Sequence, residues 1–544
     1  MTDGIVVGPM LRHVGPTSAA IWVETDRPCV VGALDATAAT FAVHGHHYAL
    51  LEIDGLEPAT TTEYHLTIDG ETVWPDPDSS FPPPRIRTRP DDTADEPVRM
   101  VFGSCRMSVP HDARHRRIYG VDALRTYAHQ VAHGRADWPD ALLLLGDQVY
   151  ADETAPQMQQ FIAARRDTSQ PPGTEVADFE EYAHLYRLAW SDPAVRWLLS
   201  TVPSAMIFDD HDIRDDWNTS RAWREQMADE PWWPDRITGG LAAYWLYQHL
   251  GNLSPDERAD DPVLAAVRES DDGGKVLHEF ARTADRDPSS YRWSFARDIG
   301  PVRLIMIDSR CGRMLEPGRR TIVDDAEWAW IDAHIRSASH ADHVLIGTSL
   351  PYLLPPGLHS VEAWNESVAD GAWGERWVKP AETMRQVVDL EHWAAFGHSF
   401  RAMERLITDV ATAPGGHRPQ TITFLSGDVH YSYAARMSYP GESDTTSRVH
   451  QLVCSPLRNP LNRAVRYLNG AAAFAVARAV GAPLAKRAGV PASTVSWRVD
   501  TGPRFDNAIA TLDLTSRSAR VHWDTGVVAD DGETSMKRIL ETDL

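Results

Sequence analysis

Six short apolar runs between residues 99 and 428, most of them ending in an acidic residue, constrain the fold of this chain more than any other feature. Helical stretches separate most of these runs, for instance residues 115–133, 324–338 and 381–410. Apolar strands that alternate with helices form a layered α/β domain with a doubly covered sheet. Ligands of such domains lie beyond the carboxyl ends of the strands, and here the reactive residue types cluster at those ends. The runs are residues 99–105, 141–147, 204–209, 302–308, 344–347 and 421–428.

The first 75 residues show a different, all-β pattern. Short apolar runs alternate there with turn signals roughly 8–12 residues apart, a spacing typical of a β-sandwich of the fibronectin or immunoglobulin kind. Residues 76–97 are rich in proline and charge and are predicted to be a linker. We therefore expect a sandwich over residues 1–75 and a layered α/β-β-α domain with helical insertions over residues 98–544.

The charge of the chain excludes one class of partner. With 53 basic and 77 acidic residues, the net charge is −24, which argues against a general binder of nucleic acid because phosphate contacts need Lys and Arg. A small phosphorylated substrate held by metal is still allowed. Residues 458–498 are the exception, with seven basic residues and no Asp or Glu. We expect a helical cap on the main domain there; a weak membrane-surface contact or a basic flap over an anionic substrate are the alternatives.

Three acidic motifs follow three of the apolar runs. Asp147 ends one run and Tyr150 follows it, residues 209–216 hold five carboxylates around His211, and Asp428 precedes a His by two residues. Carboxylates packed this closely repel one another unless cations compensate. Asp428 and His430 point to the same side of an extended chain and can reach one metal pair. Together the motifs match a dinuclear metallophosphoesterase.

On these motifs the chain resembles the alkaline phosphatase D (PhoD-like) family of metallophosphoesterases, which is related to purple acid phosphatases. The resemblance covers nearly the whole chain: the N-terminal sandwich and the motifs at residues 102–106, 145–150, 209–212 and 426–430. It implies a phosphoric ester hydrolase that uses a ferric ion with one or two calcium ions. Another divalent metal in the second site is the alternative.

The resemblance also implies a set of site residues. A metal-bound hydroxide would attack the phosphorus of a small phosphate ester, a monoester or a diester, between the two cations. The ferric ion would displace the protons of a thiol and a phenol, since metal ligands must be deprotonated. Asp147 would bridge the two sites. The ferric ligands would be Cys105, Asp147, Tyr150 and His430, and the second site would add Asp210 and Asp428.

Further roles follow from the same resemblance. His211 would donate a proton or a hydrogen bond to the leaving oxygen. Arg106 and Asn218 are candidate phosphate contacts, with a structural role as the alternative for each. Asp210 is preferred to Asp209 as a ligand because it precedes His211 directly. The other acidic residues of this loop, Asp212, Asp215 and Asp216, would hold a further calcium or cap a helix.

The N-terminus bears on the location of the protein, and two alternative functions are also considered. Members of the family are often exported, but the N-terminus shows no basic stretch followed by an apolar core, so we expect a cytoplasmic protein without a membrane span. One alternative is a non-catalytic, metal-containing binding protein of the same fold. The other is a nuclease-type phosphodiesterase, for which Arg463, Arg466 and Arg478 would supply the basic track.

Overall fold

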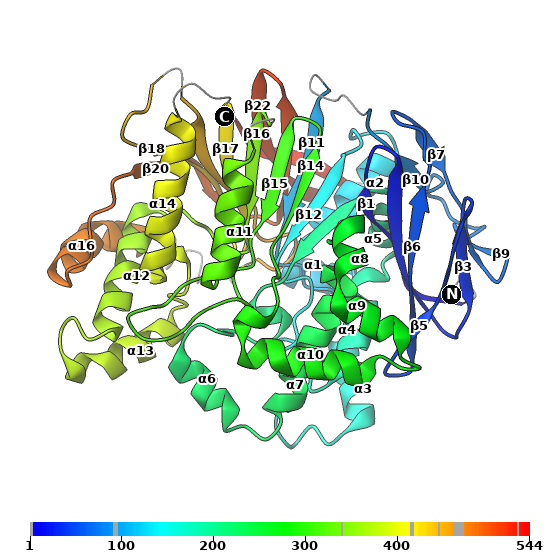
Figure 1. Cartoon of the computed structure of the whole chain (residues 1–544), viewed down its shortest axis with the longest axis horizontal. Helices are drawn as coiled ribbons and strands as arrows, with labels where there is room; N and C mark the ends of the chain where they lie inside the picture. The colour runs from blue at the N-terminus through cyan, green and yellow to red at the C-terminus, as the bar shows by residue number, and fades with distance from the viewer. Residues whose placement is uncertain are drawn as a thin grey trace.

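Two β-sheets that face one another form the centre of the molecule (Figure 1). The computed structural model describes residues 4–90, 96–338, 341–413, 418–443, 446–460, 473–529 and 532–544. The strands of these sheets are β11 (Val98–Gly103), β12 (Ala141–Leu145), β13 (Ser204–Ile207), β14 (Phe295–Ile299), β15 (Val302–Met306), β16 (His343–Gly347), β17 (Thr421–Ser426), β18 (Ser432–Ser438), β19 (Arg448–Val453), β20 (Ser496–Arg504), β21 (Ala508–Thr515), β22 (Ser518–Val528) and β23 (Thr534–Asp543). The strand orders are β13-β12-β11-β21-β22-β23 and β14-β15-β16-β17-β19-β18-β20.

The apolar runs of the sequence are the parallel strands of these sheets. β11, β12 and β13 run parallel to one another, and so do β15, β16, β17 and β19. All five residues of β12 are buried, because one face of its sheet meets helices and the other meets the second sheet. Leu143 and Leu345 belong to the apolar core between the sheets. The predicted layered α/β-β-α class is confirmed.

Helices cover the outer faces of both sheets and extend below them in Figure 1. The insertions between β12 and β14, and between β16 and β17, supply most of them. The helices are α1 (Ala113–Tyr119), α2 (Ala123–Ala132), α3 (Pro156–Arg165), α4 (Phe179–Trp190), α5 (Pro193–Thr201), α6 (Arg221–Ala228), α7 (Trp233–Ala243), α8 (Pro255–Asp260), α9 (Pro262–Glu269), α10 (Gly274–Arg286), α11 (Asp325–Arg336), α12 (Pro356–Ala369), α13 (Val378–Val387), α14 (Gly397–Thr412) and α16 (Ala473–Arg487). Short turns include the 3₁₀ turn η1 (Asp210–Asp212) and the π-helical turn η2 (Tyr244–His249).

The N-terminal domain consists of antiparallel strands that pack as a sandwich. One sheet has the order β1-β2-β6-β5 and the other β4-β3-β8-β9, and a shared core including Ile21 and Leu66 joins them. The strands are β1 (Ile5–Val14), β2 (Ser18–Thr25), β3 (Val30–Ala33), β4 (Ala36–Ala39), β5 (Phe41–Val43), β6 (His46–Asp54), β7 (Thr61–Glu63), β8 (Leu66–Ile68), β9 (Glu71–Trp74) and β10 (Arg85–Arg87).

The segment predicted as a linker differs from the expectation. β10 lies within residues 76–97 and pairs with β7 of the sandwich. Its Ile86 is buried while Arg85 and Arg87 are not, which is the alternation of a strand with one buried face. The strands of the N-terminal domain therefore continue to residue 87.

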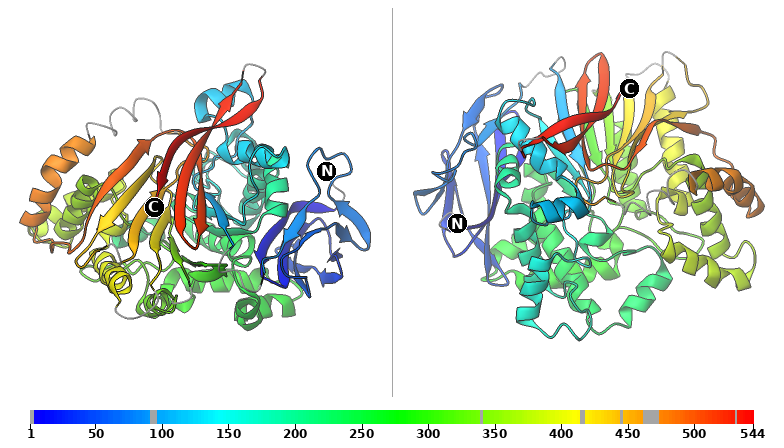
Figure 2. Two further views of the ribbon diagram at one scale, coloured as in Figure 1. Left: turned by 90° about the horizontal axis from the view of Figure 1, so that it is seen from above. Right: turned by 180° about the vertical axis from the view of Figure 1, so that it is seen from behind.

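The sandwich packs tightly against the α/β domain (Figure 2). Met10, Trp22 and Tyr48 on one face of its first sheet share a buried cluster with Tyr186 and Tyr247 of the α/β domain. The rings of Tyr186 and Tyr247 stack with their centroids 4.5 Å apart. The two domains thus have one continuous core on this side.

Only part of the predicted basic segment lies within the described structure. α16 packs against α12. Residues 461–472, and with them Arg463 and Arg466, lie outside the described residues, as does the side chain of Arg478. Within the described ranges, no helix has both the length and the apolar character that crossing a membrane requires.

Candidate metal centre

The predicted site residues meet where the parallel strands of both sheets end. Cys105 follows β11, Asp147 follows β12 and Asp209 follows β13 in the first sheet, while His430 follows β17 in the second. Because parallel strands end at the same edge, each sheet gathers its own polar residues. The two facing sheets then bring both sets together.

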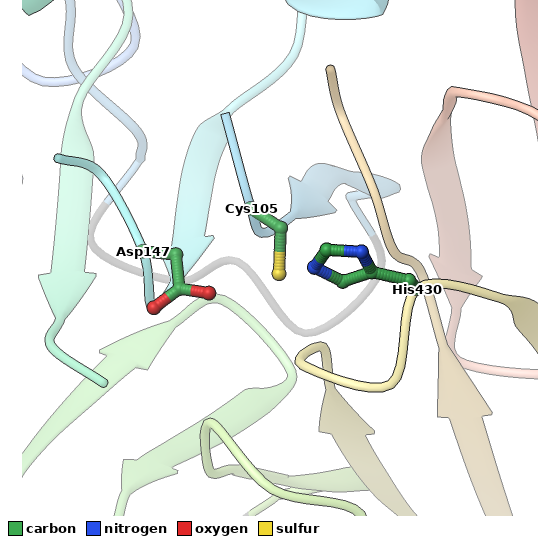
Figure 3. Close-up of side chains that lie close together, drawn as sticks. All are labelled: Cys105, Asp147 and His430. Atoms are coloured by element: carbon green, nitrogen blue, oxygen red, sulfur yellow. The ribbon is translucent and has the colours of Figure 1, made fainter. Parts of the chain in front are cut away.

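The first group of donors combines a thiol, a carboxylate and an imidazole. Donor atoms of Cys105, Asp147 and His430 all lie within 4.8 Å of one another, and Figure 3 shows their side chains converging. The hydroxyl of Tyr150 donates to Asp147 Oδ2 over 3.4 Å. The structure therefore brings together the four residues predicted for the ferric site.

The second group consists of carboxylates alone. Carboxylate oxygens of Asp147, Asp209 and Asp210 lie within 4.8 Å of one another, and all three residues are buried. Asp210 was predicted as the ligand in preference to Asp209, but the structure brings both residues to this group. Asp147 Oδ1 and Asp209 Oδ2 have no hydrogen-bond partner among the described residues. Buried carboxylate oxygens without partners are costly, so the cluster fits a bound cation.

Asp428 belongs to neither group. Its Oδ2 lies 2.9 Å from Nε2 of His392, whose Nδ1 lies 2.8 Å from Glu362. Burial raises the pKa of Asp428, but the hydrogen bond and charge of His392 outweigh it and lower the pKa to about 2. Its charge in turn raises the pKa of Asp147 and of Asp209. Asp428 therefore borders the cluster as an ionised carboxylate.

Burial shapes the protonation of the first group. It raises the pKa of Cys105, Asp147 and Tyr150 well above their ordinary values and lowers the pKa of His430 to about 4. A neutral imidazole is ready to bind a metal, whereas the thiol and the phenol must first lose a proton. A strongly charged cation is the group that can displace those protons.

The backbone at these positions is unusual. Cys105, Asp147, Asp428 and His430 all have positive φ angles, of 57°, 51°, 64° and 55°. Left-handed backbone is uncommon for residues other than glycine and persists where the surrounding structure imposes it, commonly at functional sites. The concentration of four such residues here marks the loops after the strands as functional.

His211 is held by a carboxylate that the sequence analysis did not single out. Its Nδ1 lies 3.0 Å from both carboxylate oxygens of Asp152, and its ring lies 4.8 Å from that of Tyr150. Burial lowers the pKa of His211, but the charge and hydrogen bond of Asp152 reverse the shift and raise it well above 6.5. His211 is therefore a protonated side chain beside Asp147.

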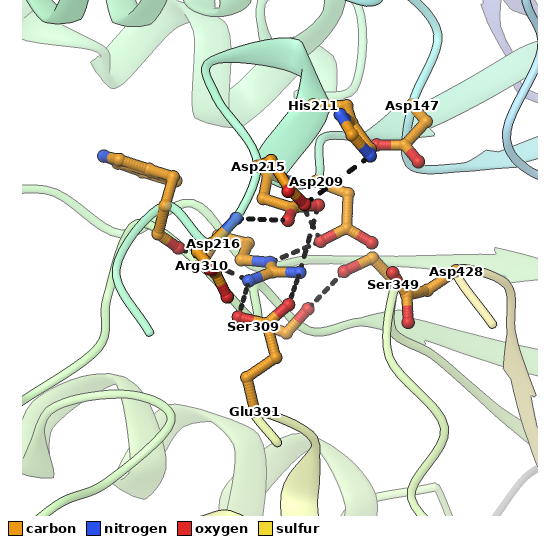
Figure 4. Close-up of polar contacts among 12 residues, drawn as sticks. Asp147, Asp209, His211, Asp215, Asp216, Ser309, Arg310, Ser349, Glu391 and Asp428 are labelled. Atoms are coloured by element: carbon orange, nitrogen blue, oxygen red, sulfur yellow. Dashed lines mark hydrogen bonds and ion pairs between the residues drawn. The ribbon is translucent and has the colours of Figure 1, made fainter. Parts of the chain in front are cut away.

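An unpredicted arginine compensates the carboxylates (Figure 4). Arg310 is fully buried; it contacts Asp209, lies 3.1 Å from Asp210 and donates to Glu391 over 2.7 Å. Arg310 follows β15, a strand that the sequence does indicate, but no pattern distinguishes it from other arginines. Glu391 follows no apolar run and offers no sequence signal.

Three further residues of the prediction make structural contacts. Arg106 forms a buried ion pair with Asp122 at 2.9 Å and donates to the carbonyl of Ala189. These contacts, and not the carboxylates of Asp147, Asp209 and Asp210, hold its guanidinium. These contacts do not support the prediction that Arg106 binds phosphate. Asn218 donates to the carbonyl of Arg310 over 3.0 Å. Asp212 caps η1, one of the two roles expected for it.

Comparison with known proteins identifies the family. A search of curated proteins finds no match. A family model described as a domain of unknown function (DUF7800) matches residues 2–86, and one described as PhoD-like phosphatase matches residues 119–482. Among solved structures, the chain is similar to "Structure of PhoD", with a TM-score of 0.60 and 13% identity over 99% of this chain and 90% of that chain.

A purple acid phosphatase from yellow lupin (Lupinus luteus) seeds aligns with a TM-score of 0.49 and 10% identity over 98% of this chain and 74% of that chain. The likeness to the PhoD structure shows the fold alone. The phosphatase family model covers more than half of the sequence. The chain therefore belongs to the PhoD-like phosphatase family and is a phosphoester hydrolase.

Proposed function

We propose that this metal-dependent phosphoesterase hydrolyses small phosphate esters at the centre described above, with a ferric ion and calcium as its metals. The observation that carries the proposal is that Asp147 belongs to both groups of donors. A thiol-containing set suits a transition metal and an all-oxygen set suits a hard divalent cation, so a carboxylate shared by both sets supports a pair of unlike cations.

The donor sets divide between the two metals by their chemistry. Cys105, Tyr150 and His430 would join Asp147 around the ferric ion, because thiolate and imidazole suit transition metals. Asp209 and Asp210 would join Asp147 around calcium, which prefers oxygen ligands, with Asp428 beside them. Bound there, the cations would supply Lewis acidity to the phosphoryl group and lower the pKa of water.

The residues of this chain would supply orientation and a proton. The protonated ring of His211 carries a hydrogen on each nitrogen: Nδ1–H donates to Asp152, and the hydrogen on Nε2 is the one that can be transferred. As the bond from phosphorus to the leaving oxygen breaks, Nε2 would give its proton to that oxygen. Arg310 offsets the charge of Asp209 and Asp210, so that the acidic loop stays folded around the site.

Replacing His211 separates proton transfer from metal binding. We expect His211→Ala to retain the metals and to lower kcat by about 10²–10⁴-fold, the usual contribution of a general acid. The loss should be smaller with nitrophenyl phosphate than with an alkyl phosphate, because nitrophenolate leaves readily without a proton. Steady-state kinetics on both esters, with elemental analysis of the same samples, measures this; His398→Ala, at an exposed position, is the control. Equal losses on the two esters would contradict proton donation.

The metals are tested on the purified protein. We expect elemental analysis to find about one iron per chain together with calcium, and chelation to stop the release of nitrophenol from nitrophenyl phosphate. Zinc or manganese in place of iron would overturn the ferric assignment while leaving a metal-dependent phosphoesterase. Full activity in metal-free protein would overturn the proposal as a whole.

A further inference from the structure

The N-terminal domain matches a family model of unknown function. One of its buried side chains begins a series of hydrogen bonds that ends at the metal centre. We propose that this domain positions the metal centre, with Arg12 of β1 as the positioning residue that acts through Asn252, Gln248 and Asp212. The inference rests on the proposed function for the location of the centre. It concerns what holds the ligands in place and not which metals they bind.

Arg12 crosses from the sandwich into the α/β domain. It is fully buried, and its guanidinium donates to the carbonyls of Tyr247 and Gln248 over 3.1 and 2.7 Å and to Asn252 Oδ1 over 3.0 Å. The two carbonyls belong to the last residues of η2, where a helical turn leaves acceptors without internal partners. A cation at that end also suits the dipole of the turn. Gly251 allows the approach, since a Cβ there would lie 2.5 Å from Arg12 Nε.

The first connection runs through Asn252 to the strand that carries the acidic loop. Its Oδ1 accepts from the backbone N–H of Met206 over 3.0 Å, and its Nδ2 donates to the carbonyl of Met206 over 2.6 Å. Met206 lies in β13, at the edge of its sheet, three residues before Asp209. The amide of Asn252 thus replaces a neighbouring strand at this edge, and Arg12 fixes that amide.

The second connection runs through Gln248 to two of the proposed ligands. The side chain of Gln248 donates to Asp212 Oδ1 over 3.2 Å. Asp212 Oδ2 accepts from the backbone N–H groups of Asp147 and Asp209 over 3.0 and 2.9 Å. One carboxylate therefore ties together the loops after β12 and β13, including the left-handed backbone of Asp147. Such supporting contacts commonly tune metal affinity and activity by about 10–100-fold.

Not every contact between the domains reaches the centre. Glu52 of β6 lies 2.8 Å from Nε of Arg258 in α8, and the guanidinium of Arg258 also donates to the carbonyl of Leu253; within the described ranges, neither side chain bonds to β13 or to the acidic loop. Glu52 is partly exposed, so its loss disturbs little else. Glu52→Gln is therefore a matched control: it weakens domain contact without touching the route through Arg12.

The test measures the two backbone amides directly. Hydrogen exchange followed by mass spectrometry, on peptides covering residues 145–150 and 206–212, reports the bonds from Asp147 and Asp209 to Asp212. We expect Arg12→Met and Asp212→Ala to speed exchange at both amides by about tenfold or more and to lower kcat by about 10–100-fold with little change in KM. Glu52→Gln should leave exchange and kcat as in the wild type.

A rescue variant guards against a general loss of folding. Asp212→Asn keeps an oxygen that can accept from both backbone N–H groups, and the amide of Gln248 can rotate so that its Oε1 accepts from the new amide; this conservative variant should therefore regain slow exchange and part of kcat relative to Asp212→Ala. Unchanged exchange in both Arg12→Met and Asp212→Ala, or equal effects of Glu52→Gln and Arg12→Met, would overturn the inference. Hydrogen exchange can be measured without turnover. If the wild type does not hydrolyse phosphate esters but the variants still show the expected changes in exchange, only the proposed function is contradicted.

Discussion

Asp147→Asn is expected to remove the metals and turnover together. The side chain is the shared member of both donor groups, and an amide carries no charge to hold two cations. We expect kcat/KM on nitrophenyl phosphate to fall by about 10³-fold or more, since cations of this kind contribute several kcal/mol to the transition state. Elemental analysis of the same sample should show less than stoichiometric metal.

Asparagine is the informative replacement at this position. It tolerates the left-handed backbone seen at Asp147, so the loop can keep its shape. Burial raises the pKa of Asp147, so an ionised carboxylate at this position destabilises the metal-free protein. The metal-free variant should therefore have a Tm no lower than that of the metal-free wild type. The exposed Asp271→Asn is the matched control and should change neither quantity. Retention of metals and full activity in Asp147→Asn would show that the site is assigned to the wrong residues.

Gly427→Ala is expected to be nearly as damaging, for a steric reason. A Cβ at Gly427 would lie 2.0 Å from Ser104 Oγ and 2.2 Å from Ser104 Cβ. Ser104 stands between the two loops: its hydroxyl accepts from the N–H of Asp428 over 3.1 Å and lies 3.1 Å from Cys105 Sγ. One methyl group would therefore push the loop of Cys105 away from that of His430.

The effect can be measured and partly reversed. We expect Gly427→Ala to lose most metal and activity and to destabilise folding by about 3 kcal/mol, at the upper end of overpacking changes. Adding Ser104→Gly removes the atoms in the way and should recover more stability than additive losses allow in a double-mutant cycle. Denaturant unfolding measures the change in stability, and elemental analysis of the same samples measures the metal content. Additive losses in the double variant would show that the clash with Ser104 is not the cause.

The parts of the site that the sequence predicts are those carried by a strand pattern. Asp147 and His430 follow apolar runs, and the parallel strands of two facing sheets bring such ends together. The family resemblance added Cys105 and Tyr150, which no local pattern distinguishes from core residues. The resemblance to the PhoD-like family and the α/β class are both confirmed.

The parts that could not be predicted depend on tertiary neighbours. Arg310 lies at the centre because Asp209 and Glu391 surround it, and those partners are far apart in the sequence. Arg106 follows Cys105 directly, yet its guanidinium forms an ion pair with Asp122, a partner that no local pattern indicates. β10 could not be predicted because its three residues, in a proline-rich segment, carry too short an alternation to indicate a strand.

The sheet order has a consequence for the synthesis of this protein. β11 pairs on one side with β12 and on the other with β21, which is translated only from residue 508 onward. Until then a nascent chain carries Cys105 beside a strand edge that can pair with other chains. His430 also emerges long after Asp147, so the growing chain has an incomplete set of ligands. The first group of donors therefore cannot be complete before His430 has been synthesised, and β11 cannot complete its pairing before β21 has been synthesised.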